Sequence, residues 1–164
     1  MMLAYRLVRL IETHSERLAE GLLVKWQACE RCQDYKKVPP QEFRQRVYEI
    51  YHNLGEWLLG KKEEDIARRY TEIGARRQAQ GVPLSQLIFA IVLVREHLWD
   101  YLKHEATLER PVEVFGELEM LQLLEQFFDR AIYYAALGYE RAQAAHSSPR
   151  EDAEKGMAEH VVGR

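Results

Sequence analysis

The segment from Gly81 to Leu102 reads GVPLSQLIFAIVLVREHLWDYL, and it decides the fold. Gly81 and Pro83 form a turn signal, eight consecutive apolar residues begin at Leu87, and charged residues at helical spacing close the segment. A helix that is apolar all round for more than two turns has to be covered on most sides. We therefore predict a central helix, from about Pro83 to Glu105, inside an all-helical domain.

Glycine and proline divide the rest of the chain into further segments and a tail. Apolar residues at helical spacing predict helices over about residues 3–33, 40–60, 63–81 and 111–145. The helix over 63–81 has few apolar positions, so we expect it to be peripheral. The first segment would be about 50 Å long as one straight helix, so we expect a bend near Gly21 or a protruding N-terminal part.

No alternating run of β-branched residues is bounded by turns, so the predicted class is all-α. We expect about five helices in a single bundle with a central apolar fourth helix. A plain bundle and a globin-like crossing arrangement fit the same apolar stripes. The predicted domain covers residues 1–146, and residues 147–164 are expected to be a flexible tail because they are poor in large apolar residues.

The composition is that of an ordinary globular protein, with 47% apolar and 30% charged residues. Lys and Arg total 23 against 26 Asp and Glu, and this balance argues against a general nucleic-acid binder. The longest apolar run is shorter than the roughly 18 residues of a membrane span. Arg6 and Arg9 interrupt the apolar N-terminus, so we predict no signal peptide, no membrane partner and a cytoplasmic location.

Four arginines lie close together in the segment over residues 63–81: Arg68, Arg69, Arg76 and Arg77. Acidic residues lie among them: Glu63, Glu64, Asp65 and Glu72. Such interleaved charges are typical of a solvated helix face, and that is the structure we predict for this stretch.

Cys29 and Cys32 form a C-x-x-C motif near the end of a predicted helix, where the helix dipole raises a thiol pKa rather than lowering it. The chain has no other cysteine to complete a four-cysteine zinc site. We predict two unbonded thiols, with a metal or redox role as the alternative. No serine lies in a glycine elbow and no glycine-rich phosphate loop exists, so we predict no catalytic residues and no enzyme.

Two histidines and two tryptophans are the candidate ligand-binding residues: His14, Trp26, His97 and Trp99. His14 falls on the apolar stripe of the first segment, and His97 flanks the apolar side of the fourth. A lone histidine at such a position usually makes a hydrogen bond within the core. The alternative is that two histidines on facing helices bracket a haem. We expect no cofactor and no bound metal, with haem as that alternative.

The segment over residues 111–145 has a broad apolar face, from Val114 to Tyr139. A face that is wider than one core requires often packs on a second copy of the chain. We therefore predict a homodimer formed through the first and fifth helices.

Scattered residues along the chain resemble a bacterial signalling family. They are the run Val47 to Leu58, then Tyr70, Gly74, Arg76 and Arg77, the run Gly81 to Leu87, then Ala90, Arg95, Leu98, Trp99 and Leu102, and finally Phe127 to Ile132 with Tyr139. Over about Ile11 to Arg141 the chain is similar to the N-terminal domain family of the RsbT co-antagonist proteins, the RsbR and RsbRD sensory module of the stressosome.

The resemblance implies a non-haem, globin-like sensory or dimerisation module without enzymatic activity. Such modules usually precede a STAS or kinase domain, whereas this sequence ends soon after the fifth helix, so it is either a free-standing module or part of a longer protein. The leading hypothesis is a sensory and dimerisation module that relays the binding of a ligand or a regulatory protein partner through helix packing. The alternatives are a haem- or metal-binding gas sensor or redox protein, and a structural dimerisation domain without a ligand.

Overall fold

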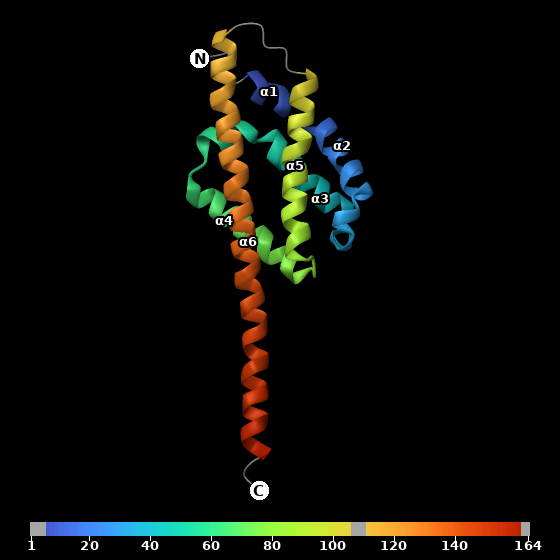
Figure 1. Cartoon of the computed structure of the whole chain (residues 1–164), viewed down its shortest axis with the longest axis vertical. Coiled ribbons are helices and arrows are strands. Elements are labelled where there is room, and N and C mark those ends of the chain that lie inside the picture. Colours follow the sequence, from blue (N-terminus) through green and yellow to red (C-terminus); the bar gives the residue numbers. More distant parts are fainter. Residues whose placement is uncertain (1–5, 106–110, 162–164) are drawn as a thin grey trace.

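The computed structural model describes residues 6–105 and 111–161, and within these ranges it contains helices and no strand (Figure 1). The all-α prediction is therefore confirmed. The α-helices are α1 (Arg6–Thr13), α2 (Ser15–Ala28), α3 (Pro40–His52), α4 (Glu63–Ala79), α5 (Leu84–Glu105) and α6 (Pro111–Val161). Two short 3₁₀ turns, η1 (Glu30–Cys32) and η2 (Asp34–Lys37), follow α2, and a π-helical segment, η3 (Glu56–Gly60), follows α3.

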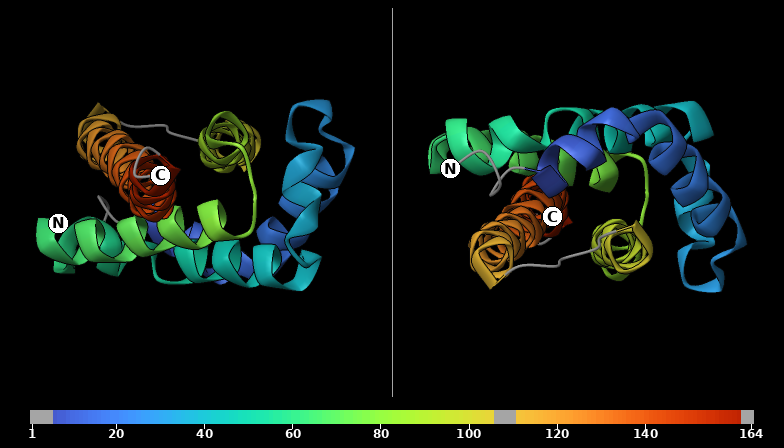
Figure 2. Two further views of the ribbon diagram at one scale, coloured as in Figure 1. Left: turned by 90° about the horizontal axis from the view of Figure 1, so that it is seen from below. Right: turned by 90° about the horizontal axis from the view of Figure 1, so that it is seen from above.

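The helices form two layers. α5 and α6 stand side by side as an antiparallel pair, and α3 and α4 cross behind them with α2 at the edge (Figure 2). The core lies between the layers, and aromatic rings fill part of it. Trp26 stacks on Phe43 with the ring centroids 4.2 Å apart, and Tyr35 meets both rings edge-on. This packing is a helical bundle, and the globin-like arrangement stays a prediction.

The first segment breaks at a different place from the one we predicted. α1 ends at Thr13 and α2 begins at Ser15, so the bend lies at His14, and α2 runs through Gly21 without interruption. Gly21 has another role: a Cβ at this position would lie 3.2 Å from the ring of His97, so the missing side chain lets α5 approach α2.

α5 begins and ends where the sequence predicts, after a turn in which Gly81 has a φ of +75°. Its inner face is buried through six residues: Leu87, Ala90, Val94, Leu98, Tyr101 and Leu102. Its opposite face is less covered than the apolar run predicts, since Ile88 and Val92 stay half-exposed.

α4 is not peripheral, contrary to the prediction, because it packs backbone to backbone against α6. A Cβ at Gly74 would lie 2.0 Å from the carbonyl oxygen of Ala135, and one at Gly138 would lie 2.2 Å from that of Thr71. α4 and α6 therefore pack closely through two glycines rather than through large apolar side chains. The apolar-stripe argument undervalued this helix because glycine adds nothing to a stripe.

α6 is 51 residues long, which corresponds to about 75 Å at the rise of an α-helix. Its first half packs on α4 and α5, and its second half extends below the other helices (Figure 1). The backbone stays helical from the predicted end at Ala145 to Val161. The flexibility of residues 147–164 remains a prediction, and residues 162–164 lie outside the described part of the chain.

Candidate functional site

His97 lies on α5 with its ring against Gly21 of α2. Its Nε2 lies 3.0 Å from the carbonyl oxygen of Leu18, so Nε2 carries the proton and donates it. Burial lowers the pKa of His97, and the nearby Lys25 cation adds to this effect. The ring lines an open pocket of about 490 Å³ with mainly basic side chains around it, among them Arg17, Lys25, Lys103 and His104.

His14 occupies the break between α1 and α2. Its ring tilts against Tyr101 of α5 at a centroid distance of 6.2 Å, and it lines a second open pocket of about 510 Å³ together with Tyr48 and His52. The two predicted histidines thus line different pockets, and neither pocket brings them together.

The two candidate tryptophans lie apart from these pockets. Trp26 is 1% exposed and belongs to the aromatic core. Trp99 is half-buried between α5 and α6, where its Nε1 donates a hydrogen bond of 2.8 Å to Glu125. Ligand binding by the four residues remains a prediction, and the structure does not gather them at one described pocket.

Cys29 and Cys32 are both free thiols, as predicted. Cys29 ends α2 and Cys32 is buried in η1. Burial and the adjacent Cys29 raise the pKa of Cys32 to about 12, so this thiol stays protonated near neutral pH. Within residues 6–105 and 117–147, no group of three or more His, Cys, Asp or Glu side chains is placed to hold a metal ion.

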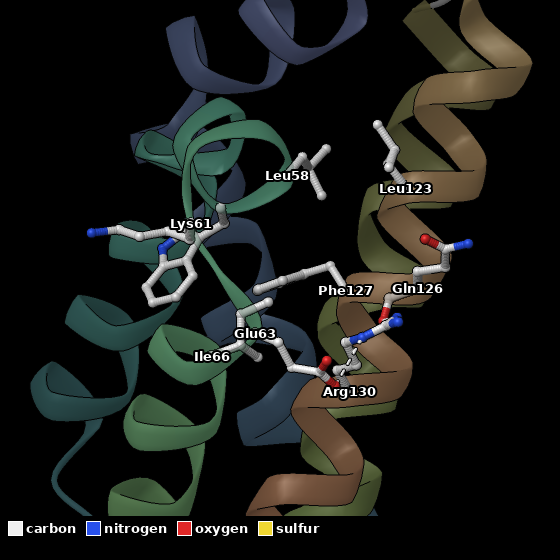
Figure 3. A pocket seen from close by; sticks show the side chains of 9 residues that line it. Leu58, Lys61, Glu63, Ile66, Leu123, Gln126, Phe127 and Arg130 are labelled. Atoms are coloured by element: carbon white, nitrogen blue, oxygen red, sulfur yellow. Dashed lines mark hydrogen bonds and ion pairs between the residues drawn. The ribbon is translucent and has the colours of Figure 1, made fainter.

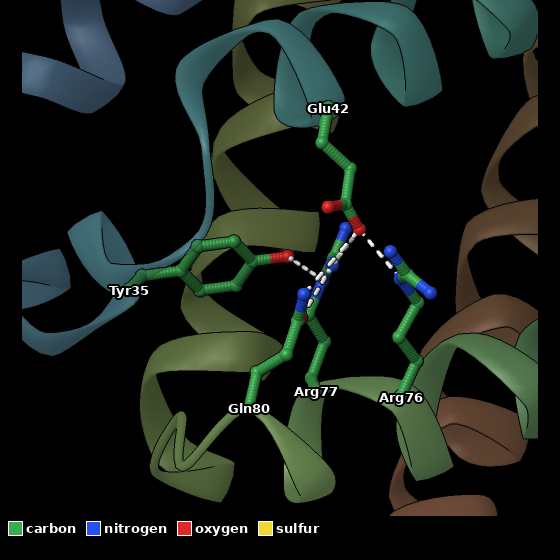
Figure 4. Close-up of polar contacts among 5 residues, drawn as sticks. All are labelled: Tyr35, Glu42, Arg76, Arg77 and Gln80. Carbon is green, nitrogen blue, oxygen red and sulfur yellow. Dashed lines mark hydrogen bonds and ion pairs between the residues drawn. The ribbon is translucent and has the colours of Figure 1, made fainter.

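Arg77 departs most clearly from the prediction of a solvated arginine face. It is 1% exposed, it donates from Nε to the hydroxyl of Tyr35 at 2.8 Å, and it donates from Nη1 to Glu42 at 2.8 Å (Figure 4). Gln80 accepts a further bond from Nη1, and Arg76 approaches the same Glu42 oxygen from the solvent side. The network ties η2, α3 and α4 together.

The charged groups in this network shift one another's pKa values. The hydrogen bond from Arg76 and the contact with Arg77 lower the pKa of Glu42 to about 2. Burial raises the pKa of Tyr35, although Arg77 offsets part of that rise. The sequence holds a signal that we missed. Arg77 follows Tyr70 by seven residues, so it continues the buried stripe of α4 rather than its outer face.

A pocket of about 190 Å³ lies between η3 and α6 (Figure 3). Leu58, Ile66 and Phe127 supply apolar wall. Glu63 on its rim accepts a hydrogen bond of 3.1 Å from Tyr134 and lies 3.5 Å from Arg130. These rim charges are already paired with each other. The contacts of Glu63 with Tyr134 and Arg130 therefore hold the start of α4 against α6.

The outer face of α5 and α6 leaves several apolar side chains partly open to solvent. Ile88, Val92, Arg95 and Trp99 recur at helical spacing on α5 and are all half-buried. On α6, Leu118 is 54% exposed and Tyr133 is 60% exposed. Arg95 bridges the two helices through Glu125 at 3.5 Å and Asp129 at 3.3 Å. In the part of the chain that the structure covers, no helix is long and apolar enough to cross a membrane.

A family model matches most of the chain. No curated protein and no solved structure matches the chain. One family model, described as the RsbT co-antagonist protein rsbRD N-terminal domain, matches residues 15–153. That range includes α2 to α5, the Arg77 network and most of α6. The chain therefore belongs to the family of RsbT co-antagonist protein rsbRD N-terminal domains.

Proposed function

We propose that this chain is a non-enzymatic sensory and dimerisation module of bacterial stress signalling. It acts in the cytoplasm and relays the binding of a ligand or a regulatory protein through helix packing. Membership of the RsbRD N-terminal family supports the signalling role. The proposal of a dimer rests on the half-exposed apolar face on α5 and α6.

The shape of α6 supports this face as the interface. An isolated helix is only marginally stable in water, and the second half of α6 extends beyond the other helices (Figure 1). A second copy along α6 would cover Leu118 and Tyr133. In the α1 part of the predicted first helix, Leu7, Val8 and Ile11 are already buried in their own chain. A contribution of the α2 part to the dimer stays a prediction.

The proposed mechanism is a change in the relative population of two packings of the dimer. A ligand that binds one packing better shifts the equilibrium toward it by its difference in affinity. α6 contacts α4 through the glycine crossing and extends outside the fold. A small shift of α4 would therefore move α6 and change the position of its protruding part.

Light scattering on the purified chain at micromolar concentration tests the dimer. We expect twice the chain mass of 19.3 kDa. Tyr133→Glu places a charge in the proposed interface and should weaken the dimer by at least about tenfold, since each 1.4 kcal/mol is tenfold in affinity. Leu59→Glu is the matched control, because Leu59 is 51% exposed in η3, outside the first predicted helix and outside α5 and α6.

A wild-type chain that is monomeric throughout the micromolar range would contradict the proposal. An equal loss of dimer in the Tyr133 and Leu59 variants would show that added charge, rather than its place on α6, is responsible.

A further inference from the structure

Cys29 and Cys32 are the only two cysteines of the chain, and the fold holds them in one turn. The backbone N–H of Cys32 donates to the carbonyl oxygen of Cys29 at 3.3 Å, which closes a 3₁₀ turn at η1. A turn of this kind keeps the two Cα atoms less than about 7 Å apart, close to the span that a disulfide bridges. The side chains are also in contact, because the thiol of Cys32 donates a hydrogen bond to the sulfur of Cys29.

The two thiols differ in how far a reagent can reach them. Cys32 is 0% exposed, whereas Cys29 is partly exposed at the end of α2. Burial and the contact with Cys29 also raise the pKa of Cys32, so Cys32 holds its proton near neutral pH. The thiolate, and not the thiol, is the nucleophile in disulfide exchange. Cys29 is therefore the residue that attacks first, and Cys32 is the residue that closes the bond.

The turn with the two cysteines lies against the start of α5. The guanidinium of Arg31 lies over the ring of Phe89, 5.1 Å from its centroid. The side-chain oxygen of Gln86 accepts hydrogen bonds of 2.9 and 3.0 Å from the backbone N–H groups of Asp34 and Tyr35. A disulfide holds its sulfur atoms about 2.05 Å apart, closer than two hydrogen-bonded thiols, so closing the bond tightens the turn. These contacts would pass that movement to α5, which carries half of the open face.

We infer that Cys29 and Cys32 form a thiol–disulfide exchange site that reacts with a low-molecular-weight disulfide. The thiolate of Cys29 attacks one sulfur of that disulfide, which forms a mixed disulfide and releases one small thiolate. Cys32 then gives its proton to solvent and attacks the Cys29 sulfur, and the second small thiolate leaves. Both released thiolates take up the protons that the two cysteines lost. The protein dithiol is thus oxidised to a disulfide, and the small disulfide is reduced to two thiols.

This chemistry would give the proposed sensory module a redox input. Protein disulfides that form in a reducing compartment are usually transient and serve catalysis or redox sensing. The end of a helix does not favour a thiolate, but the intrinsic nucleophilicity of thiolates rises with their pKa, which offsets part of that loss. The inference deepens the proposed function, and its regulatory meaning rests on that function.

Equilibration of the full chain with mixtures of reduced and oxidised glutathione tests the site. N-ethylmaleimide added in denaturant traps the remaining thiols, and mass spectrometry identifies the products. We expect the reduced chain to take up two maleimides, because it holds two cysteines. The oxidised chain should have the mass of a single chain, with no maleimide and no glutathione attached.

Two single-cysteine variants test the order of attack. Cys32→Ser should stop at the mixed disulfide, with one glutathione on Cys29. Cys29→Ser keeps only the buried thiol, which should react with oxidised glutathione at least about tenfold more slowly. The same comparison in denaturant is the matched control, because both thiols are then exposed and the two rates should become similar. Circular dichroism checks that each variant is folded.

Three results would overturn the inference: two maleimides per chain even in oxidised glutathione alone, a glutathione on each cysteine in place of a disulfide, or equal rates in the two folded variants. Light scattering measures the oligomeric state of the reduced and oxidised chains separately. A monomer that forms the disulfide would contradict the proposed dimer and support the exchange site, and a dimer that never forms the disulfide would do the reverse.

Discussion

Arg77 joins α4 to η2 and α3 through buried hydrogen bonds to Tyr35 and Glu42. Arg77→Met keeps most of the side-chain volume but leaves the hydroxyl of Tyr35 and one side of Glu42 without their partner. Removing one member of a buried ion pair costs about 3–5 kcal/mol, so we expect a loss of at least about 3 kcal/mol in the free energy of unfolding. Urea denaturation measures it.

Arg76→Gln is the comparison for this prediction, because Arg76 contacts the same Glu42 oxygen with its side chain 52% exposed. Exposed pairs contribute about 0–1 kcal/mol, so this change should cost less than about 1 kcal/mol. Equal losses in the two variants would show that burial of Arg77 does not govern the network.

Glu42 makes this network sensitive to acid. Its folded-state pKa is about 2 against an ordinary value of 4.5, because Arg76 and Arg77 stabilise the carboxylate. The stability that it contributes is complete above about pH 4.5 and is lost as the pH falls toward 2. Wild type should therefore exceed Glu42→Gln in urea midpoint at pH 7, and the difference should narrow between pH 4.5 and pH 2. A difference that is constant over this range would refute the assignment.

For single residues, the sequence predicts which side chains are buried but not which partners they contact. Arg46 and Arg77 both fall on apolar stripes, three residues after Phe43 and seven after Tyr70. Position alone predicts that each is at least partly buried. It cannot predict that Arg77 contacts Tyr35 and Glu42 while Arg46 lies near Arg69 and Glu49, since this depends on how α3 and α4 meet.

The crossing of α4 and α6 is the contact between elements with the least room for change. Gly74→Ala and Gly138→Ala would each place a Cβ within 2.2 Å of a backbone oxygen, which no side-chain movement relieves. We expect each to cost more than about 3 kcal/mol or to prevent folding. Thermal unfolding followed by circular dichroism measures the effect.

Gly60→Ala is the control for the crossing. The nearest atom to a Cβ at Gly60 is a side-chain carbon of Glu56 at 3.6 Å, which is ordinary contact. Its change should leave the melting temperature within about 2 °C. Tolerance of alanine at Gly74 and Gly138 would mean that the helices do not touch as described.

Helix existence could be predicted at the scale of elements, and helix boundaries only where proline or glycine marks them. Pro40 and the turn before Leu84 fixed the starts of α3 and α5. The break at His14 has no such marker, and Gly21 misled the prediction because its role is close packing against His97. Sequence patterns also do not show close packing through glycine, and for this reason we predicted α4 to be peripheral although Gly74 packs it against α6.

The whole molecule combines a helical bundle, which the Arg77 network and the crossing of α4 and α6 hold together, with an open face on α5 and α6. α5 packs on the core with one side and carries half of the open face on the other. The sequence predicted a broad apolar face and a dimer. It could not predict the Arg77 network, because that network combines residues from η2, α3 and α4.

The most direct test is the dissociation constant of the dimer, measured by sedimentation equilibrium for wild type and Tyr133→Glu. We expect a wild-type dimer in the micromolar range and a dissociation constant at least about tenfold larger in Tyr133→Glu, since each 1.4 kcal/mol is tenfold in affinity. A wild type that stays monomeric, or equal dissociation constants in the two proteins, would contradict dimerisation through the face on α5 and α6.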